Sequence, residues 1–151
     1  PLVPALKSYW IAIHVTAAIT ATGAFTVGGI STALYLAAAR GGDGASRLPS
    51  AETLDRLAHR VIMFAFPIWT FAIIAGAIWA DQAWGRYWGW DPKEIWSFVT
   101  WVVYAGYLHA RATAGWKGRK AAAISLVAYG CLLFNFFGVN YMFSGLHSYA
   151  G

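Results

Sequence analysis

The sequence is poor in the residues from which most soluble enzymes build their active sites. Only 11% of its 151 residues are charged, and it contains four histidines and a single cysteine, Cys131. Because there is no Cys-x-x-Cys pair, the chain is neither a thiol oxidoreductase nor an acceptor of covalently attached haem. Cys131 lies within an apolar run, where a free thiol usually serves as a small hydrophobic side chain.

Long hydrophobic runs take the place of the missing polar residues. The chain is 59% hydrophobic, which is typical of membrane proteins, and a transmembrane helix needs about 20 mostly apolar residues. No stretch shows the strict alternation of a membrane barrel strand. We therefore expect an all-α fold, a polytopic membrane helix bundle with about four transmembrane helices in a single domain, residues 1–151. The predicted spans are Tyr9 to Ala39, Val61 to Trp79, Ile95 to Ala110 (or Pro92 to Leu108) and Ala121 to Val139.

The basic residues are distributed unevenly along the chain. Eight of the eleven lie in the two segments that join the first span to the second and the third span to the fourth. By the positive-inside rule these segments face the cytoplasm, so both termini and the segment between the second and third spans face outward. The charges act as topology signals, and we expect no nucleic-acid partner. The eight residues are Arg40, Arg47, Arg56, Arg60, Arg111, Lys117, Arg119 and Lys120, and the other three are Lys7, Arg86 and Lys93.

The segment between the second and third predicted spans is rich in aromatic rings. Three tryptophans and one tyrosine fall within seven residues, with two glycines between them. Glycines keep the backbone thin, so that a flat ligand can approach the rings closely. We name residues 84–91 the aromatic loop, and its rings are Trp84, Tyr87, Trp88 and Trp90.

A helix start follows directly after these rings. Asp91 can cap the helix, Pro92 suits its first position, and Glu94 falls at the capping-box position. Asp91 therefore has a structural role available beside any functional one.

Two of the four histidines are expected on the same side as the aromatic loop. His14 lies a turn or two inside the outer end of the first span, and His147 lies in the outward tail after the fourth. His109 follows Pro92 by 17 residues, which places it about 25 Å along the helix, near the cytoplasmic side. A histidine within a span is a functional hypothesis by default. The structural alternatives are a polar contact between helices for His14, an interfacial anchor for His109 and a surface position for His147. His59 is expected in the inner loop, without a functional role.

Outward histidines beside flat rings favour haem over other ligands. Haem iron takes axial imidazoles and the porphyrin faces take aromatic walls, whereas zinc prefers three or four ligands with cysteine or carboxylate among them. A membrane b-type electron-transfer subunit, with two histidine pairs across two helices, stays as an alternative. So does a packing or assembly subunit that binds no haem.

The aromatic loop and the histidine segments together resemble a known family. The run from Trp84 to Glu94, WGRYWGWDPKE, resembles the tryptophan-rich WWD signature of haem-handling proteins of the CcmC, CcmF and CcsA types. Further stretches narrow the resemblance to the CcsA (ResC) type across essentially the whole chain. They are YWIAIHV around His14, YLHAR around His109, GVN at 138–140 and GLHSYA around His147.

The resemblance implies a function and a set of partners. CcsA-type proteins work with a CcsB (ResB) membrane subunit as the system II cytochrome c synthetase. This haem lyase attaches haem b (iron protoporphyrin IX) to the CxxCH segment of apocytochrome c, and a thioredoxin-like apocytochrome reductant takes part indirectly. The implied location is the plasma (inner) membrane of a bacterium or the thylakoid membrane, with the aromatic loop on the periplasmic (extracytoplasmic) side. A CcmF-type or CcmC-type haem handler is the nearest alternative.

The resemblance also implies which residues form the site. His14 and His147 match the two outer haem-iron ligands, and His109 matches an intramembrane histidine that binds haem in transit. Asp91 matches the acid of the signature and is expected to act with His14 and His147 at the catalytic site. His59 matches no family ligand. Trp84, Trp88, Trp90 and Asp91 match the platform under the outer haem, and we expect Tyr87 to form a further wall of the porphyrin site.

Family members are usually longer than this chain. The sequence starts at Pro1 without a methionine. We therefore expect a fragment that lacks N-terminal helices.

Overall fold

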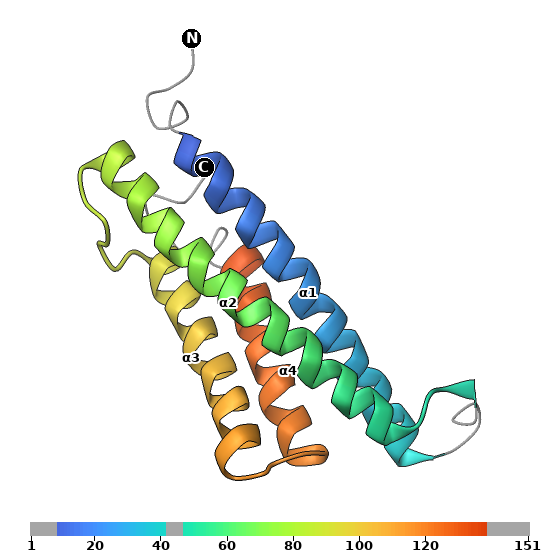
Figure 1. The fold of residues 1–151 in the computed structure, drawn as a ribbon. Helices are drawn as coiled ribbons and strands as arrows, with labels where there is room; N and C mark the ends of the chain where they lie inside the picture. The colour runs from blue at the N-terminus through green and yellow to red at the C-terminus, as the bar shows by residue number, and fades with distance from the viewer. Residues whose placement is uncertain (1–8, 42–46, 139–151) are drawn as a thin grey trace.

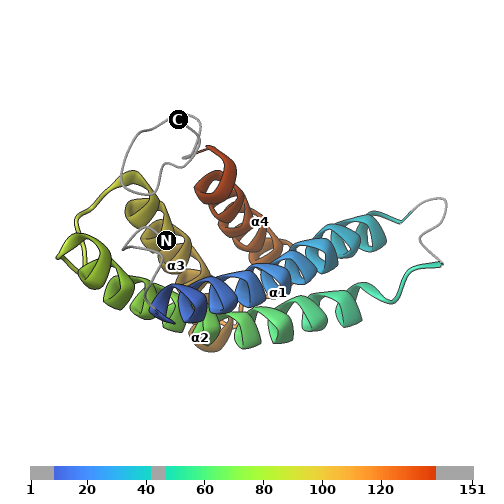
Figure 2. The same cartoon turned by 90° about the horizontal axis from the view of Figure 1, so that it is seen from above.

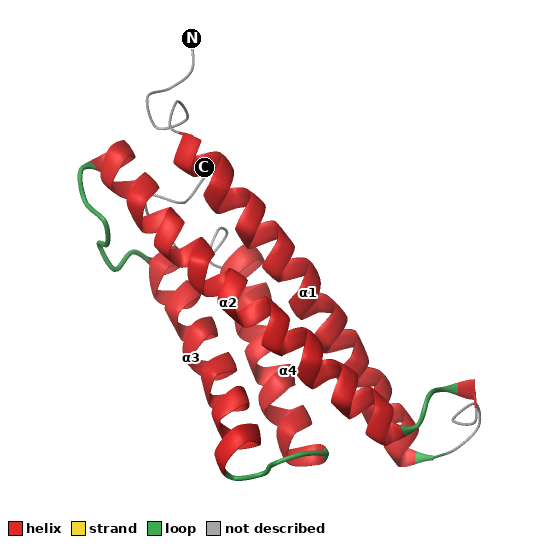
Figure 3. Ribbon diagram, viewed as in Figure 1, coloured by secondary structure: helices red, strands yellow, loops and turns green. Residues whose placement is uncertain are grey.

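The computed structural model describes residues 9–41 and 47–138, and within these ranges the chain is almost wholly helical (Figure 1, Figure 3). The α-helices there are α1 (Tyr9–Arg40), α2 (Ala51–Trp84), α3 (Pro92–Thr113) and α4 (Arg119–Leu133). A π-helical turn, η3 (Phe134–Gly138), continues α4. The prediction of an all-α helix bundle is confirmed for the described residues.

Three of the described helical segments are long and apolar enough to cross a membrane. They are α1, α2 and the 20-residue run Arg119–Gly138. With 22 residues α3 has a sufficient length, but it carries Lys93 and Glu94 at its start and Arg111 near its end, which makes it less apolar. The chain is thus a polytopic membrane helix bundle, and the predicted span at α3 stays a prediction.

The bundle consists of two helical hairpins. The long helices α1 and α2 lie side by side, and the shorter pair α3 and α4 packs against them (Figure 1, Figure 2). Small residues of α1 permit this close packing, because a methyl group at Gly28 would lie 3.1 Å from Cγ1 of Ile62 and one at Gly29 would lie 3.2 Å from the ring of Tyr129. Helix pairs in membranes commonly use small residues in this way.

Aromatic side chains fill the core where the two hairpins meet. Phe25 of α1 stacks on Tyr104 of α3 with ring centroids 3.8 Å apart, and Trp69 of α2 meets Phe25 edge-on. Trp69 Nε1 donates a hydrogen bond to the carbonyl of Ser97 at 3.3 Å, which joins α2 to α3. A buried indole N–H usually has a hydrogen-bond partner, and these contacts fix the relative position of the helices that carry the site.

An ion pair ties the helices together at the end of the bundle remote from the aromatic loop. Nη1 of Arg111 donates to Oδ1 of Asp55 at 2.9 Å, and Nη2 donates to Oδ2 at 3.2 Å. The prediction that the neighbouring His59 lies in a loop is wrong. The side chain of Ser50 caps α2 by accepting from the Thr53 N–H at 3.2 Å, so the helix already begins at Ala51 and includes His59.

Candidate functional site

The aromatic loop is held at both ends by helix caps. At its start Gly85 adopts the left-handed conformation, with φ of 77°, and its N–H donates to the carbonyl of Asp81. At its end Asp91 accepts a hydrogen bond from the Glu94 N–H at 2.9 Å, and Pro92 occupies the first turn of α3. The capping role predicted for Asp91 is therefore confirmed. The Glu94 carboxylate binds the Gly89 N–H at 2.7 Å and so folds the loop back onto α3.

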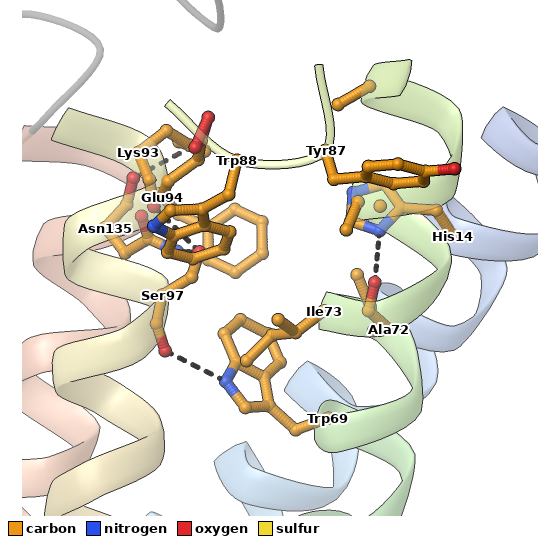
Figure 4. Close-up of a pocket in the computed structure, with 15 residues that line it drawn as sticks. His14, Trp69, Ala72, Ile73, Tyr87, Trp88, Lys93, Glu94, Ser97 and Asn135 are labelled. Carbon is orange, nitrogen blue, oxygen red and sulfur yellow. Dashed lines mark hydrogen bonds between the residues drawn. The ribbon is translucent and has the colours of Figure 1, made fainter. Parts of the chain in front are cut away.

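A cavity lies beneath this loop, between α1, α2, α3 and η3. Its empty space amounts to about 660 Å³, a figure that includes space open to the outside. Figure 4 shows His14 and Tyr87 on one side of the cavity and Trp88, Lys93 and Asn135 on the other. Segments far apart in the sequence therefore converge on one space.

His14 is fixed in place by α2. Its Nδ1 lies 2.7 Å from the carbonyl oxygen of Ala72 (Figure 4). A carbonyl can only accept, so Nδ1 carries the proton and Nε2 of the neutral ring carries the lone pair. Metal-binding histidines are commonly oriented by a hydrogen bond of this kind. The imidazole also stacks beside Trp79, with ring centroids 6.2 Å apart and planes inclined by 12°.

A glycine one helical turn above Ala72 makes this position possible. A methyl group at Gly76 would lie 2.7 Å from both Cε1 and Nδ1 of His14, which is closer than real Cβ contacts allow. Since Gly76 has no side chain, the imidazole lies directly against the α2 backbone. The sequence alone did not predict this contact between His14 and the backbone at Gly76.

The rings of the aromatic loop occupy different places. Tyr87 and Trp88 line the cavity. Trp84 packs on Trp79 at the end of α2, with centroids 5.0 Å apart. Trp90 is 62% exposed and meets Trp88 edge-on at 5.5 Å. Its φ of 56° lies in the left-handed region, which costs a non-glycine residue roughly 1–3 kcal/mol and is found most often at functional sites.

The side of the cavity opposite His14 is polar. Lys93 Nζ donates to the backbone carbonyl of Asn135 at 2.9 Å and lies 4.9 Å from the centre of the Phe136 ring. Ser97 Oγ donates to the carbonyl of Lys93 at 2.8 Å and accepts from Asn135 Nδ2 at 3.3 Å. Sequence reasoning missed Asn135, although an amide between phenylalanines in an apolar run was a signal for it.

The remaining predicted histidines do not line this cavity in the described part of the chain. His109 lies near the far end of α3, is exposed on the bundle surface and contacts Thr113. His59 is partly buried with its ring 6.2 Å from that of Tyr107. His147, the second predicted outer ligand, lies outside the described residues.

Comparison with known proteins gives consistent matches. Residues 1–147 match the family described as cytochrome C assembly protein. The chain is similar to the "Cytochrome c biogenesis protein CcsA" of Synechococcus elongatus, with 38% identity over 196 aligned residues that cover 99% of this chain and 60% of that protein. The protein of the same name from Gloeobacter violaceus is 36% identical, with 99% of this chain and 60% of that protein covered. The one from Chlamydomonas reinhardtii is 43% identical, with 99% and 43% covered. The chain thus spans about 60% or less of the length of these relatives.

Proposed function

The chain belongs to the cytochrome C assembly protein family, and from this membership we propose that it is a haem-handling subunit in cytochrome c maturation. In this proposal it acts with a CcsB (ResB) type membrane subunit as a system II cytochrome c synthetase. The substrates are haem b and the CxxCH segment of an apocytochrome c, which a thioredoxin-like partner keeps reduced. The aromatic loop faces the extracytoplasmic side of a bacterial plasma membrane or a thylakoid membrane.

The observation that carries the proposal is the fixed imidazole of His14 at the wall of the cavity. Its Nδ1–H is directed to the Ala72 carbonyl at 2.7 Å, the kind of hydrogen bond that commonly orients a metal-binding histidine. Gly76 supplies the space for the ring, and Tyr87 and Trp88 supply aromatic walls. These residues fit haem, whose iron takes imidazole and whose faces take aromatic rings.

In this mechanism the residues of the chain bind the haem and orient it. His14 and His147 would hold the haem iron. Asp91 contributes by holding the start of α3, and with it Glu94 and the aromatic loop, in place. The chemistry itself belongs to the haem vinyl groups. Each cysteine sulfur bonds to one vinyl carbon and its proton passes to the other, which leaves a thioether with no net oxidation.

His109 has a separate role in the proposal, which is to receive haem on its way from the cytoplasmic side. Its exposed position near the far end of α3 supports this role, because a ligand or a partner helix can reach the ring from outside the bundle. Arg111 is not available as a partner for the haem propionates while it is paired with Asp55.

An absorption spectrum tests the proposal. The full-length protein is purified with its partner as wild type, as His14→Ala/His147→Ala and as His59→Ala, the control histidine. We expect a bis-imidazole haem spectrum in the wild type and the control, and its loss in the double variant. An unchanged spectrum in the double variant would refute the assignment of the outer ligands. A well-folded wild-type complex that binds no haem would refute the function.

A further inference from the structure

The polar side of the cavity contains two buried atoms without a partner. Trp88 Nε1, a hydrogen-bond donor, and Asn135 Oδ1, an acceptor, are buried and have no hydrogen-bond partner among the described residues. Asn135 is 2% exposed, and both residues line the same cavity (Figure 4). A buried polar atom without a partner costs about 1–3 kcal/mol, so such a pair is retained where a ligand completes it.

The surrounding hydrogen bonds fix which atom of the Asn135 amide is left without a partner. The one hydroxyl proton of Ser97 is donated to the Lys93 carbonyl at 2.8 Å. Ser97 Oγ can therefore only accept from Asn135, which places the amide nitrogen, Nδ2, against it at 3.3 Å. The amide cannot be turned around without losing this contact. Oδ1 of Asn135 is thus an acceptor that lacks a donor.

Lys93 adds a charge beside these two atoms. Its ammonium has three N–H bonds, and the Asn135 carbonyl takes one of them. The neighbouring carboxylates are held by backbone groups, since Glu94 accepts from the Gly89 N–H and Asp91 accepts from the Glu94 N–H. Both acids thus serve to fold the loop, and Lys93 and Glu94 both line the cavity.

We propose that Trp88, Lys93 and Asn135 form a subsite for a carboxyl group, and that this group is a propionate of the haem held by His14. The inference rests on the proposed function and specifies how the porphyrin is oriented. The carboxyl oxygens accept from Trp88 Nε1 and Lys93 Nζ. Asn135 Oδ1 accepts a hydrogen bond from a water bound to that carboxylate. With His14 on the other side of the cavity, the porphyrin enters with its propionate edge toward η3.

Two porphyrins that differ only in their carboxyl groups test the subsite. The full-length protein in detergent is titrated with iron protoporphyrin IX and with its dimethyl ester, and the two dissociation constants are compared. Since hydrogen bonds to charged groups contribute more than neutral ones, we expect the wild type to prefer the free acid by about tenfold or more. Lys93→Met and Trp88→Phe should each bring the ratio toward one, because each removes a hydrogen-bond donor to the carboxyl group.

Matched control variants lie at the opposite end of the bundle. Lys117→Met and Trp116→Phe remove the same chemical groups from the loop between α3 and α4, and both should keep the wild-type ratio. A wild-type ratio of one, or an unchanged ratio in Lys93→Met and Trp88→Phe, would overturn the subsite and leave only water at these atoms. A wild type that binds neither porphyrin would instead refute haem binding itself. Retained affinity for the ester shows that a variant is folded.

Discussion

Replacing Gly76 by alanine should weaken haem binding without removing any ligand. The added methyl group would lie 2.7 Å from both Cε1 and Nδ1 of His14. The imidazole must retreat by about 0.7 Å to reach the 3.4 Å of an ordinary contact. That movement lengthens the 2.7 Å hydrogen bond to the Ala72 carbonyl and turns Nε2 away from its position in the cavity.

The size of the effect follows from what such supporting contacts contribute elsewhere. Loss of an outer-shell partner of a metal-binding histidine lowers metal affinity about 10- to 100-fold. We therefore expect the dissociation constant for iron protoporphyrin IX to rise about 10- to 100-fold in Gly76→Ala. The low-spin bis-imidazole bands should weaken in parallel, since the axial bond is the one disturbed. Spectroscopic titration of the purified protein measures both quantities.

Gly106→Ala in α3 is the matched control. A methyl group at Gly106 has nothing within 4 Å, and alanine favours a helix over glycine by about 1 kcal/mol. This variant should bind haem like the wild type and be at least as stable. If Gly76→Ala also bound haem like the wild type, the claim that the space at Gly76 positions the His14 ring would be refuted.

Three further variants test other parts of the structure. Asp55→Asn should lower the free energy of unfolding by about 3 kcal/mol, because it leaves the largely buried Arg111 without its charge partner; a denaturation midpoint equal to wild type would contradict this. His109→Ala should reduce the haem that co-purifies while leaving titration of added haem unchanged, and equal co-purification would exclude a transit role. Asn135→Leu should keep the ligand-free protein within about 1 kcal/mol of wild-type stability, because removing an oxygen without a partner offsets the loss of the Nδ2 bond to Ser97. A loss above about 2 kcal/mol on thermal or denaturant unfolding would show that this oxygen is satisfied.

The helices were predictable from sequence because their signals are local. Apolar runs of sufficient length predict spans, and the Asp91-Pro92 pair predicts the start of α3, as the structure confirms. His59 is assigned to the inner loop from sequence because it precedes the apolar run that begins at Val61. A helix can continue beyond an apolar run when a residue such as Ser50 caps it, and then charged side chains simply lie on its surface.

The site was only partly predictable because its decisive contacts join residues distant in sequence. The identity of His14 indicates a ligand, but its orientation depends on Ala72 and Gly76, about 60 residues later. Likewise, Asn135 carries no motif, and its role depends on the bonding of Ser97 and Lys93. Tertiary contacts of this kind leave no periodic pattern in the chain.

The cavity draws its walls from both ends of the described chain, which constrains the order in which the protein can be made. His14 enters the membrane first, whereas Asn135 is synthesised 121 residues later. At about 5–20 residues per second, a nascent chain spends roughly 6–24 s with its histidine in place and no η3 to close the cavity. A ribosome-bound or truncated intermediate therefore exposes the imidazole without the opposite wall. If haem binds as proposed, capture that needs both walls can occur only after residue 135 has been synthesised.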